Sequence, residues 1–182
     1  MRASEPELLA RALALAAEAH AGQTRKGDDV PYLGHPLRVA GLVLEFGGGS
    51  ELAAVALLHD TLEDCPDVTP ERLLAAFEAP VAERVLALTD LLEGDTPGRK
   101  GPWIERKRSY LAALASADVG TRLVAACDKL DNLRSLVRDL DSHGAAVLES
   151  FNGSPSQTRW YYEAVREVVH DSAPAALLRE LD

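Results

Sequence analysis

Histidine and aspartate residues end or interrupt apolar segments at three places in this 182-residue chain. His35 precedes a proline at the start of a predicted helix, the pair His59-Asp60 follows one apolar run, and Asp128 follows another. A buried carboxylate costs free energy unless it is paired or binds a metal. We therefore interpret His35, His59, Asp60 and Asp128 as the ligands of one metal ion.

Two imidazoles and two carboxylates form a ligand set of intermediate hardness, which suits Mn²⁺ or Fe²⁺, with Zn²⁺ or Mg²⁺ as alternatives. Neighbouring side chains on a helix point about 100° apart. His59 and Asp60 can thus share an ion only off the end of their helix or between helices. Four protein ligands leave two positions of an octahedron for water and substrate.

Helices must position these residues, because apolar residues recur at helical spacing and no alternating β-branched run predicts a strand. The polar segments 22–34 and 92–102 are expected to be loops, and 144–156 is ambiguous. One all-α domain over 1–182, a bundle of about eight to ten helices, is the expected architecture. The predicted helices lie at about 4–20, 35–46, 50–64, just after Thr69, and at 81–92, 103–115, 118–140, 158–170 and 173–181.

Composition limits the partners of the protein. The formal net charge is −10, from 19 Lys and Arg against 29 Asp and Glu, which disfavours binding to nucleic-acid polymers and anionic membranes. Cys65 and Cys127 lack CxxC spacing, which is typical of free thiols in a reducing compartment. No signal sequence or membrane-length apolar run is evident, so we expect a cytoplasmic protein. Residues 99–108 hold five cations and one acid, so the negative net charge remains compatible with a small nucleotide substrate.

Four ordered segments resemble HD-domain metal phosphohydrolases, and more narrowly the (p)ppGpp hydrolase domain of the RelA/SpoT homologues. The segments are AHAGQTRKGDDVPYLGHP (19–36), ALLHDTLED (56–64), ERK (105–107) and DKLDNLRSL (128–136). The resemblance implies an HD-domain helical bundle that removes pyrophosphate from the 3′ position of (p)ppGpp with Mn²⁺, leaving GDP or GTP. Because the chain stops at Asp182, we expect it to be similar to the stand-alone small alarmone hydrolases.

The resemblance also implies roles for individual residues. It assigns the four metal ligands above, a catalytic acidic pair at Glu63 and Asp64, and nucleotide contacts at Arg25, Lys26, Tyr32 and Asn132, with Arg25 against the base and Asn132 near the ribose. The spacing agrees, because Glu63 and Asp64 each follow a metal ligand by four residues and would share its helical face.

Two further nucleotide contacts are hypotheses with alternatives. Among three consecutive aromatics, we choose Tyr161 as the ring near the nucleotide, although all three could be core residues. Lys107 and its basic neighbours could balance phosphate charge, or could form a solvated helix face.

The sequence departs from the family pattern at Cys127 and Asp131, and segments 94–102 and 143–158 do not align with it.

Two other functions remain open. The same chemistry could act on another nucleotide, such as the 2′-phosphate of NADPH or an adenosine alarmone. Alternatively, the domain could bind a nucleotide without turnover, although a pure sensor would not need Glu63 and Asp64. The sequence does not indicate an oligomeric state.

Overall fold

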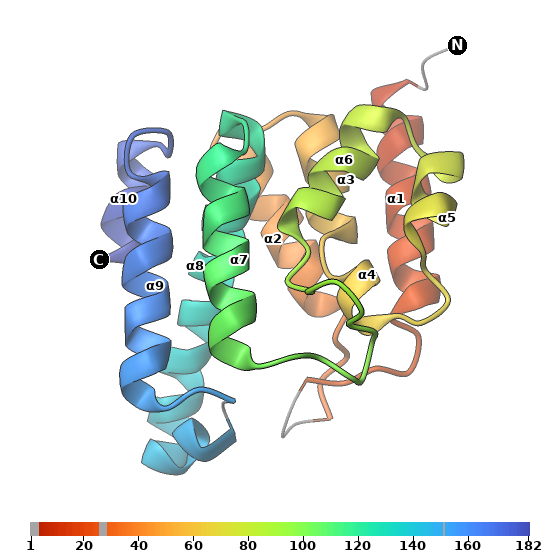
Figure 1. Cartoon of the computed structure of the whole chain (residues 1–182). Helices are drawn as coiled ribbons and strands as arrows, with labels where there is room; N and C mark the ends of the chain where they lie inside the picture. Colours follow the sequence, from red (N-terminus) through yellow and green to blue (C-terminus); the bar gives the residue numbers. More distant parts are fainter. Residues whose placement is uncertain (1–3, 26–28, 151) are drawn as a thin grey trace.

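The computed structural model describes residues 4–25, 29–150 and 152–182. Its regular structure is helical throughout. In those ranges the only strand-like pairings are two isolated bridges, Thr24 with Pro31 and Thr96 with Arg99. The all-α prediction is therefore confirmed (Figure 1).

The helices form a bundle in which α1 and α5 lie on one side and α9 and α10 on the other (Figure 1). The elements are α1 (Glu5–Ala19), α2 (Gly34–Glu45), α3 (Ser50–Leu58), α4 (Thr61–Asp64), α5 (Pro70–Ala76), α6 (Ala79–Leu88), α7 (Trp103–Ser116), α8 (Val119–His143), the 3₁₀-helix η1 (Gly144–Ser150), α9 (Pro155–Val169) and α10 (Ala175–Leu181).

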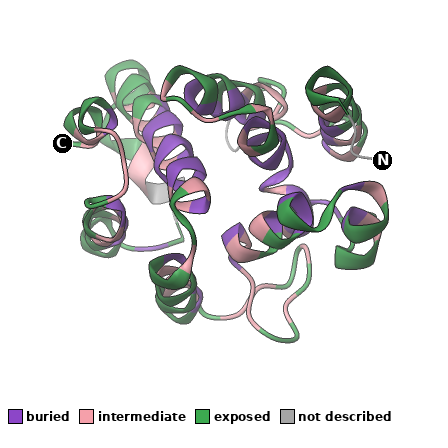
Figure 2. Cartoon of the chain, turned by 90° about the horizontal axis from the view of Figure 1, so that it is seen from above, coloured by how far each residue is buried: buried purple, intermediate pink, exposed green. Residues whose placement is uncertain are grey.

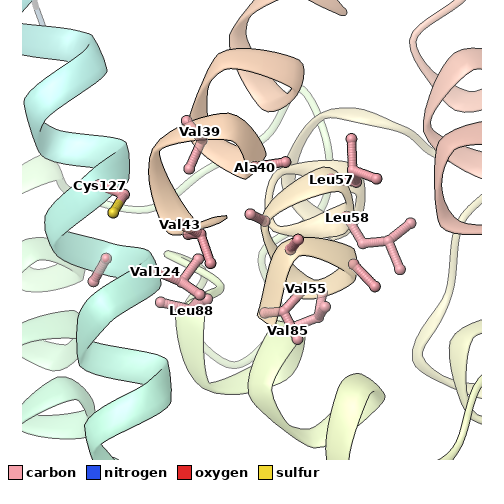
Figure 3. Close-up of a cluster of buried hydrophobic side chains, with 14 of the residues drawn as sticks. Val39, Ala40, Val43, Val55, Leu57, Leu58, Val85, Leu88, Val124 and Cys127 are labelled. Carbon is pink, nitrogen blue, oxygen red and sulfur yellow. The ribbon is translucent and has the colours of Figure 1, made fainter. Parts of the chain in front are cut away.

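Helix α3 lies at the centre of the core. Every residue from Ala53 to Leu58 is buried, and a helix that is apolar on all sides is one surrounded by other elements. Its neighbours include α1, α2, α6 and α8. Figure 3 shows Val55 and Leu58 of α3 in the same cluster as Val43 of α2 and Val124 of α8. Figure 2 shows the buried faces of the helices turned inward and the exposed residues outside.

The 25-residue helix α8 is the longest element. The Asp118 carboxylate caps its start by accepting the backbone N–H of Thr121 at 2.8 Å. It continues past the predicted end at about Leu140 and stops at Gly144, whose φ of 67° lies in the left-handed region that favours glycine. Because α8 is continuous, the spacing of its polar residues along one face is fixed.

Several predicted boundaries were wrong. The predicted helix at 81–92 ends at Leu88, which leaves Asp90 in the following segment. The ambiguous segment 144–156 contains η1, and α9 begins earlier than predicted because Ser154 and Gln157 form a capping box.

The predicted helix at 50–64 divides at His59 and Asp60, so that α3 and α4 are separate. Two side chains bond carbonyls of the last turn of α3: His59 Nδ1–H donates to the Ala56 carbonyl at 2.7 Å, and Thr61 Oγ1–H donates to the Leu58 carbonyl at 2.7 Å. Such local bonds compete with a continuing helix. The division places His59 and Asp60 off the end of α3, the arrangement that sharing one ion requires.

Among the described residues, no helix has both the length and the apolar character needed to cross a bilayer.

Candidate active site

Three of the four predicted metal ligands meet in the interior. His35 at the start of α2, His59 after α3 and Asp128 on α8 are buried, and each offers one ligand atom within 4.8 Å of the others. Asp60 faces the same point, with its Oδ2 atom 3.1 Å from His59 Nε2 and 3.4 Å from His35 Nε2. The structure thus brings together all four residues.

In both imidazoles a hydrogen-bond acceptor holds Nδ1 on the side away from the centre. The Ala56 carbonyl and the Asp131 carboxylate can only accept, so Nδ1 carries the proton in both His59 and His35, at 2.7 Å in each bond. Both rings therefore present Nε2 to the centre. His59 Nε2 is buried, and although Asp60 Oδ2 lies 3.1 Å away, no described atom is aligned to form a hydrogen bond with it. A divalent cation would satisfy this atom, so the donor set fits a metal.

The electrostatics of the centre also favour a cation. Burial acts to lower the pKa of His35, but hydrogen bonds to Asp128, Asp131 and Asp60 raise it to about 10. Burial acts to raise the pKa of Asp128, but Lys129 and the two histidines hold it well below its usual value. Clustered carboxylates thus make positive charge favourable at this point.

The predicted acidic pair lies beside the centre, in two different environments. The Glu63 carboxylate has 14% side-chain exposure and accepts the Asp90 backbone N–H at 2.7 Å. Burial and the nearby Asp60 raise its pKa, while Lys100 acts against them. Asp64 has 38% side-chain exposure. Lys100 Nζ contacts both carboxylates, at 3.2 Å for Glu63 and 3.1 Å for Asp64.

A cationic and aromatic wall lies near the acidic pair. Lys107 Nζ lies 4.6 Å from the centre of the Tyr161 ring and donates to Asp90 at 2.5 Å. Burial and the neighbouring Lys129 lower the pKa of Lys107. The Tyr161 hydroxyl is buried and unpartnered within the described part of the chain. Of the basic neighbours of Lys107, Arg106 is buried against Asp90, whereas Arg99 and Arg108 are exposed.

Sequence reasoning missed Lys129 and Asp90. Lys129 donates to Asp128 at 2.6 Å and lies over the Tyr161 ring. Its place directly after a predicted ligand was the signal available in the sequence. Asp90 had no such signal, because its role depends on α6 ending at Leu88.

Two cavities share Tyr32 and Asn132 in their linings. The inner cavity has a volume of about 190 Å³ and contains the metal ligands, the acidic pair and the wall of Lys107, Lys129 and Tyr161. The outer cavity, of about 340 Å³, is lined by Arg25, Trp103, Ser135, Leu136, Asp139, Val147, Asn152 and Tyr162 together with the two shared residues.

The shared residues also contact the metal ligands. The Tyr32 hydroxyl donates to Asp60 at 2.5 Å, and Asn132 Nδ2–H donates to Asp128 at 2.6 Å. Arg25 lines the outer cavity and Tyr161 the inner one, whereas Lys26 lies outside the described residues.

A family model described as HD domain matches residues 12–151, which contain all four predicted ligands. The chain belongs to the HD-domain family. This membership implies a divalent metal, and His35, His59, Asp60 and Asp128 are the residues that this HD domain offers for it.

Curated relatives support the membership. The HD domain is 36% identical over 135 residues to a guanosine-3′,5′-bis(diphosphate) 3′-pyrophosphohydrolase of Vibrio cholerae and 34% identical over 129 residues to a probable one of Synechocystis. These matches cover 73% and 71% of this chain but 19% and 17% of the relatives, so the chain spans less than a fifth of their length. The Mus musculus guanosine-3′,5′-bis(diphosphate) 3′-pyrophosphohydrolase MESH1 is closer in size: 36% identity covers 74% of this chain and 73% of the mouse protein.

Two solved structures are similar to this HD domain over most of its length. A metazoan ortholog of SpoT, described as hydrolysing ppGpp, matches with a TM-score of 0.76 and 25% identity, covering 100% of this HD domain and 94% of that chain. A protein of Listeria monocytogenes EGD-e matches with a TM-score of 0.68 and 26% identity, covering 81% and 93%.

Proposed function

We propose that this HD domain is a hydrolase that removes pyrophosphate from the 3′ position of (p)ppGpp, leaving GDP or GTP. The observation that carries the proposal is a pair of neighbouring cavities that share Tyr32 and Asn132, with a cation site and an acidic pair in one and room for a nucleoside in the other. The names of the bacterial and mouse relatives, which are 3′-pyrophosphohydrolases of this nucleotide, support the same substrate.

Mn²⁺ is the cation we propose for His35, His59, Asp60 and Asp128, because two imidazoles and two carboxylates suit it; Fe²⁺, Zn²⁺ and Mg²⁺ are the alternatives. When bound, such a cation supplies Lewis-acid activation of a phosphoryl group and of water. The protein contributes the orientation of the four ligands, and Tyr32 and Asn132 hold two of the carboxylates in place.

We assign proton transfer to the acidic pair, Glu63 and Asp64. Water adds to the phosphorus that is bonded to the 3′-oxygen, the P–O3′ bond breaks, and the 3′-oxygen takes a proton. Glu63 accepts the proton of the attacking water and can return it to the 3′-oxygen, because burial raises its pKa toward the working pH. Asp64 is the more exposed member, and we assign it the role of orienting the water.

Charge on the departing pyrophosphate requires cations in the inner cavity. Lys107 and Lys129 both line it, and the Tyr161 hydroxyl beside them has no hydrogen-bond partner among the described residues. Preformed cations and donors stabilise charge that develops in a transition state. We assign Lys107 and Tyr161 to the phosphate groups, with Lys129 as an additional cation.

The outer cavity favours guanine over adenine. Asp139 provides a carboxylate in its lining, and Arg25 supplies a planar guanidinium that can stack on a base. Guanine presents two adjacent N–H donors, at N1 and N2, that one carboxylate can accept together, whereas adenine offers its N6 donor beside an acceptor at N1 that a carboxylate would repel. We therefore propose a guanosine alarmone rather than an adenosine alarmone or NADPH as the substrate.

A Mn²⁺-dependent assay on ppGpp, pApp and NADPH, with chromatography of the products, tests the proposal. We expect pyrophosphate and GDP from ppGpp, and loss of both turnover and stoichiometric metal in Asp128→Ala. Preferential turnover of pApp or NADPH would replace the substrate, and tight ppGpp binding without pyrophosphate release would indicate a nucleotide-binding module. We place the activity in the cytoplasm, which suits the free, buried thiols of Cys65 and Cys127.

A further inference from the structure

Asp131 is a buried carboxylate to which the proposed chemistry assigns no role. It follows Asp128 by three residues on α8, and its side chain is 4% exposed. An ionised carboxylate at this depth is costly unless several partners satisfy it. Asp131 has three partners, two on α2 and one in the polar segment before it.

The first partner is a metal ligand. His35 Nδ1–H donates to Asp131 Oδ2 at 2.7 Å. This bond fixes which nitrogen of the ring carries the proton and limits rotation of the ring about its bond to Cβ. A carboxylate behind a metal-ligating imidazole also increases the basicity of the nitrogen that faces the metal.

The second partner anchors the carboxylate. Arg38 lies one turn after His35 on α2, and its Nε–H donates to Asp131 Oδ1 at 2.6 Å while Nη2–H donates to Oδ2 at 3.1 Å. A two-pronged arginine–carboxylate contact fixes position as well as charge. Asp131 is therefore held from α2 at two points and cannot turn away from His35.

The third partner belongs to the outer cavity. Arg25 Nη1 lies 3.8 Å from Asp131 Oδ2 and donates to Ser135 Oγ at 3.1 Å. Its side chain is 19% exposed, so the guanidinium is largely held by the protein. The same carboxylate thus touches a ligand of the inner cavity and a lining residue of the outer one.

We propose that Asp131 is a positioning residue that fixes the His35 ring for the cation and holds Arg25 at the outer cavity. The first half depends only on the metal site, whereas the second half rests on the proposed function. Loss of the carboxylate would free both groups at once, although neither the cation nor the nucleotide would touch Asp131 itself.

The metal half is tested without substrate. Mn²⁺ affinity is measured by electron paramagnetic resonance titration of Asp131→Ala, Asp131→Asn and the control Asp141→Ala, which alters an exposed residue of the same helix. We expect the dissociation constant to rise about 10- to 100-fold in Asp131→Ala. Asp131→Asn, which keeps an acceptor for His35, is expected to fall between Asp131→Ala and the wild type, and the control to match the wild type.

Folding is measured in parallel by denaturant unfolding of the metal-free proteins, because Asp131→Ala also leaves Arg38 without its partner. A less stable Asp131→Ala protein that binds Mn²⁺ as tightly as the wild type would overturn the proposal in favour of a structural role alone. If Asp131→Ala does not fold, Asp131→Asn carries the test: wild-type affinity in that variant overturns the metal half, and weakened affinity supports it.

The nucleotide half is tested at saturating Mn²⁺, so that metal loss does not contribute. We expect KM for ppGpp to rise several-fold in Asp131→Asn, with a smaller effect on kcat. An unchanged KM would overturn the assignment to Arg25. A wild-type protein that does not hydrolyse ppGpp would instead refute the proposed function, and the metal titration would still decide the first half.

Discussion

Glu63 and Asp64 are adjacent in the sequence, yet their carboxylates have different surroundings. Glu63 is largely buried and bonded to the Asp90 backbone, while Asp64 is partly exposed. Because desolvation raises a carboxyl pKa, the buried member is the better proton acceptor near neutral pH. We therefore expect Glu63 to contribute more to proton transfer than Asp64.

Glu63→Gln should reduce kcat for ppGpp by about 10²- to 10⁴-fold, the usual loss when a general base is removed. Asp64→Asn should cause a smaller loss, and both variants should retain Mn²⁺, since neither residue is a predicted ligand. Steady-state kinetics with metal analysis measures both effects. A larger loss in Asp64→Asn than in Glu63→Gln would reverse the assignment.

Lys100→Ala should shift the acidic limb of the kcat/KM profile to higher pH. Burial and Asp60 raise the pKa of Glu63, and Lys100 opposes them, so removal of the cation raises this pKa further. A base acts only when deprotonated, so activity would be lost at a higher pH than in the wild type. The exposed neighbour Arg99 provides the control: Arg99→Ala should leave the profile unchanged. An identical limb in Lys100→Ala would exclude Glu63 as the titrating base.

Helix ends decide where the chemistry lies, and the sequence predicted helices better than helix ends. Apolar periodicity predicted the all-α fold and identified the four metal ligands as polar residues beside apolar helical runs. It did not predict the division of 50–64, because the side chains of His59 and Thr61 bond carbonyls that a continuous helix would use. Nor did it predict the end of α6 at Leu88, which frees the Asp90 backbone N–H for Glu63.

Contacts between segments that are distant in the sequence could not be predicted from residue patterns. The residue types at Asp131 and Lys129 were visible, but their roles depend on how α8 packs against α2 and α9. Motif resemblance located Arg25, Tyr32 and Asn132, and the structure places all three around the outer cavity. It could not show that Tyr161 lines the inner cavity while Tyr162 lines the outer one.

The start of α8 offers a test at the level of one helix. Asp118→Ala should lower the free energy of unfolding by about 1 kcal/mol at pH 7, because the Thr121 N–H loses its cap. Asp118→Asn should lose less, since asparagine also caps helices.

The effect should depend on pH. Burial acts to raise the pKa of Asp118, but the Thr121 N–H and Arg84 hold it below its usual value. The stabilisation is therefore full above the unfolded pKa and is lost as pH falls through the folded one. Denaturant unfolding at pH 7 and pH 3 measures this, and a gap between wild type and Asp118→Ala that is equal at both would contradict it.

Across the whole molecule, the metal site joins elements that are distant in sequence. Its ligands come from α2, the end of α3 and α8, and the same three helices contribute side chains to the central core. A cation that binds the folded but not the unfolded chain stabilises the fold by mass action. Metal binding and global stability should therefore be coupled.

Mn²⁺ at 100 times its dissociation constant should raise the unfolding free energy by about 2.7 kcal/mol. Thermal unfolding with increasing Mn²⁺ should show a rising Tm in the wild type and an unchanged Tm in Asp128→Ala. Glu63→Gln, which alters the cavity but not the ligand set, should respond as the wild type does. A Tm that rises equally in Asp128→Ala would place the cation elsewhere.

Helix α8 carries Asp128, Asn132, Ser135 and Asp139 along one side, from the inner cavity to the far end of the outer one. A single-residue deletion between them would turn every later side chain by about 100° and move it by about 1.5 Å. Point substitutions leave this register intact. We therefore expect this stretch of the gene to tolerate missense changes that retune the base preference, but to reject in-frame insertions and deletions, even at codons whose side chains face solvent.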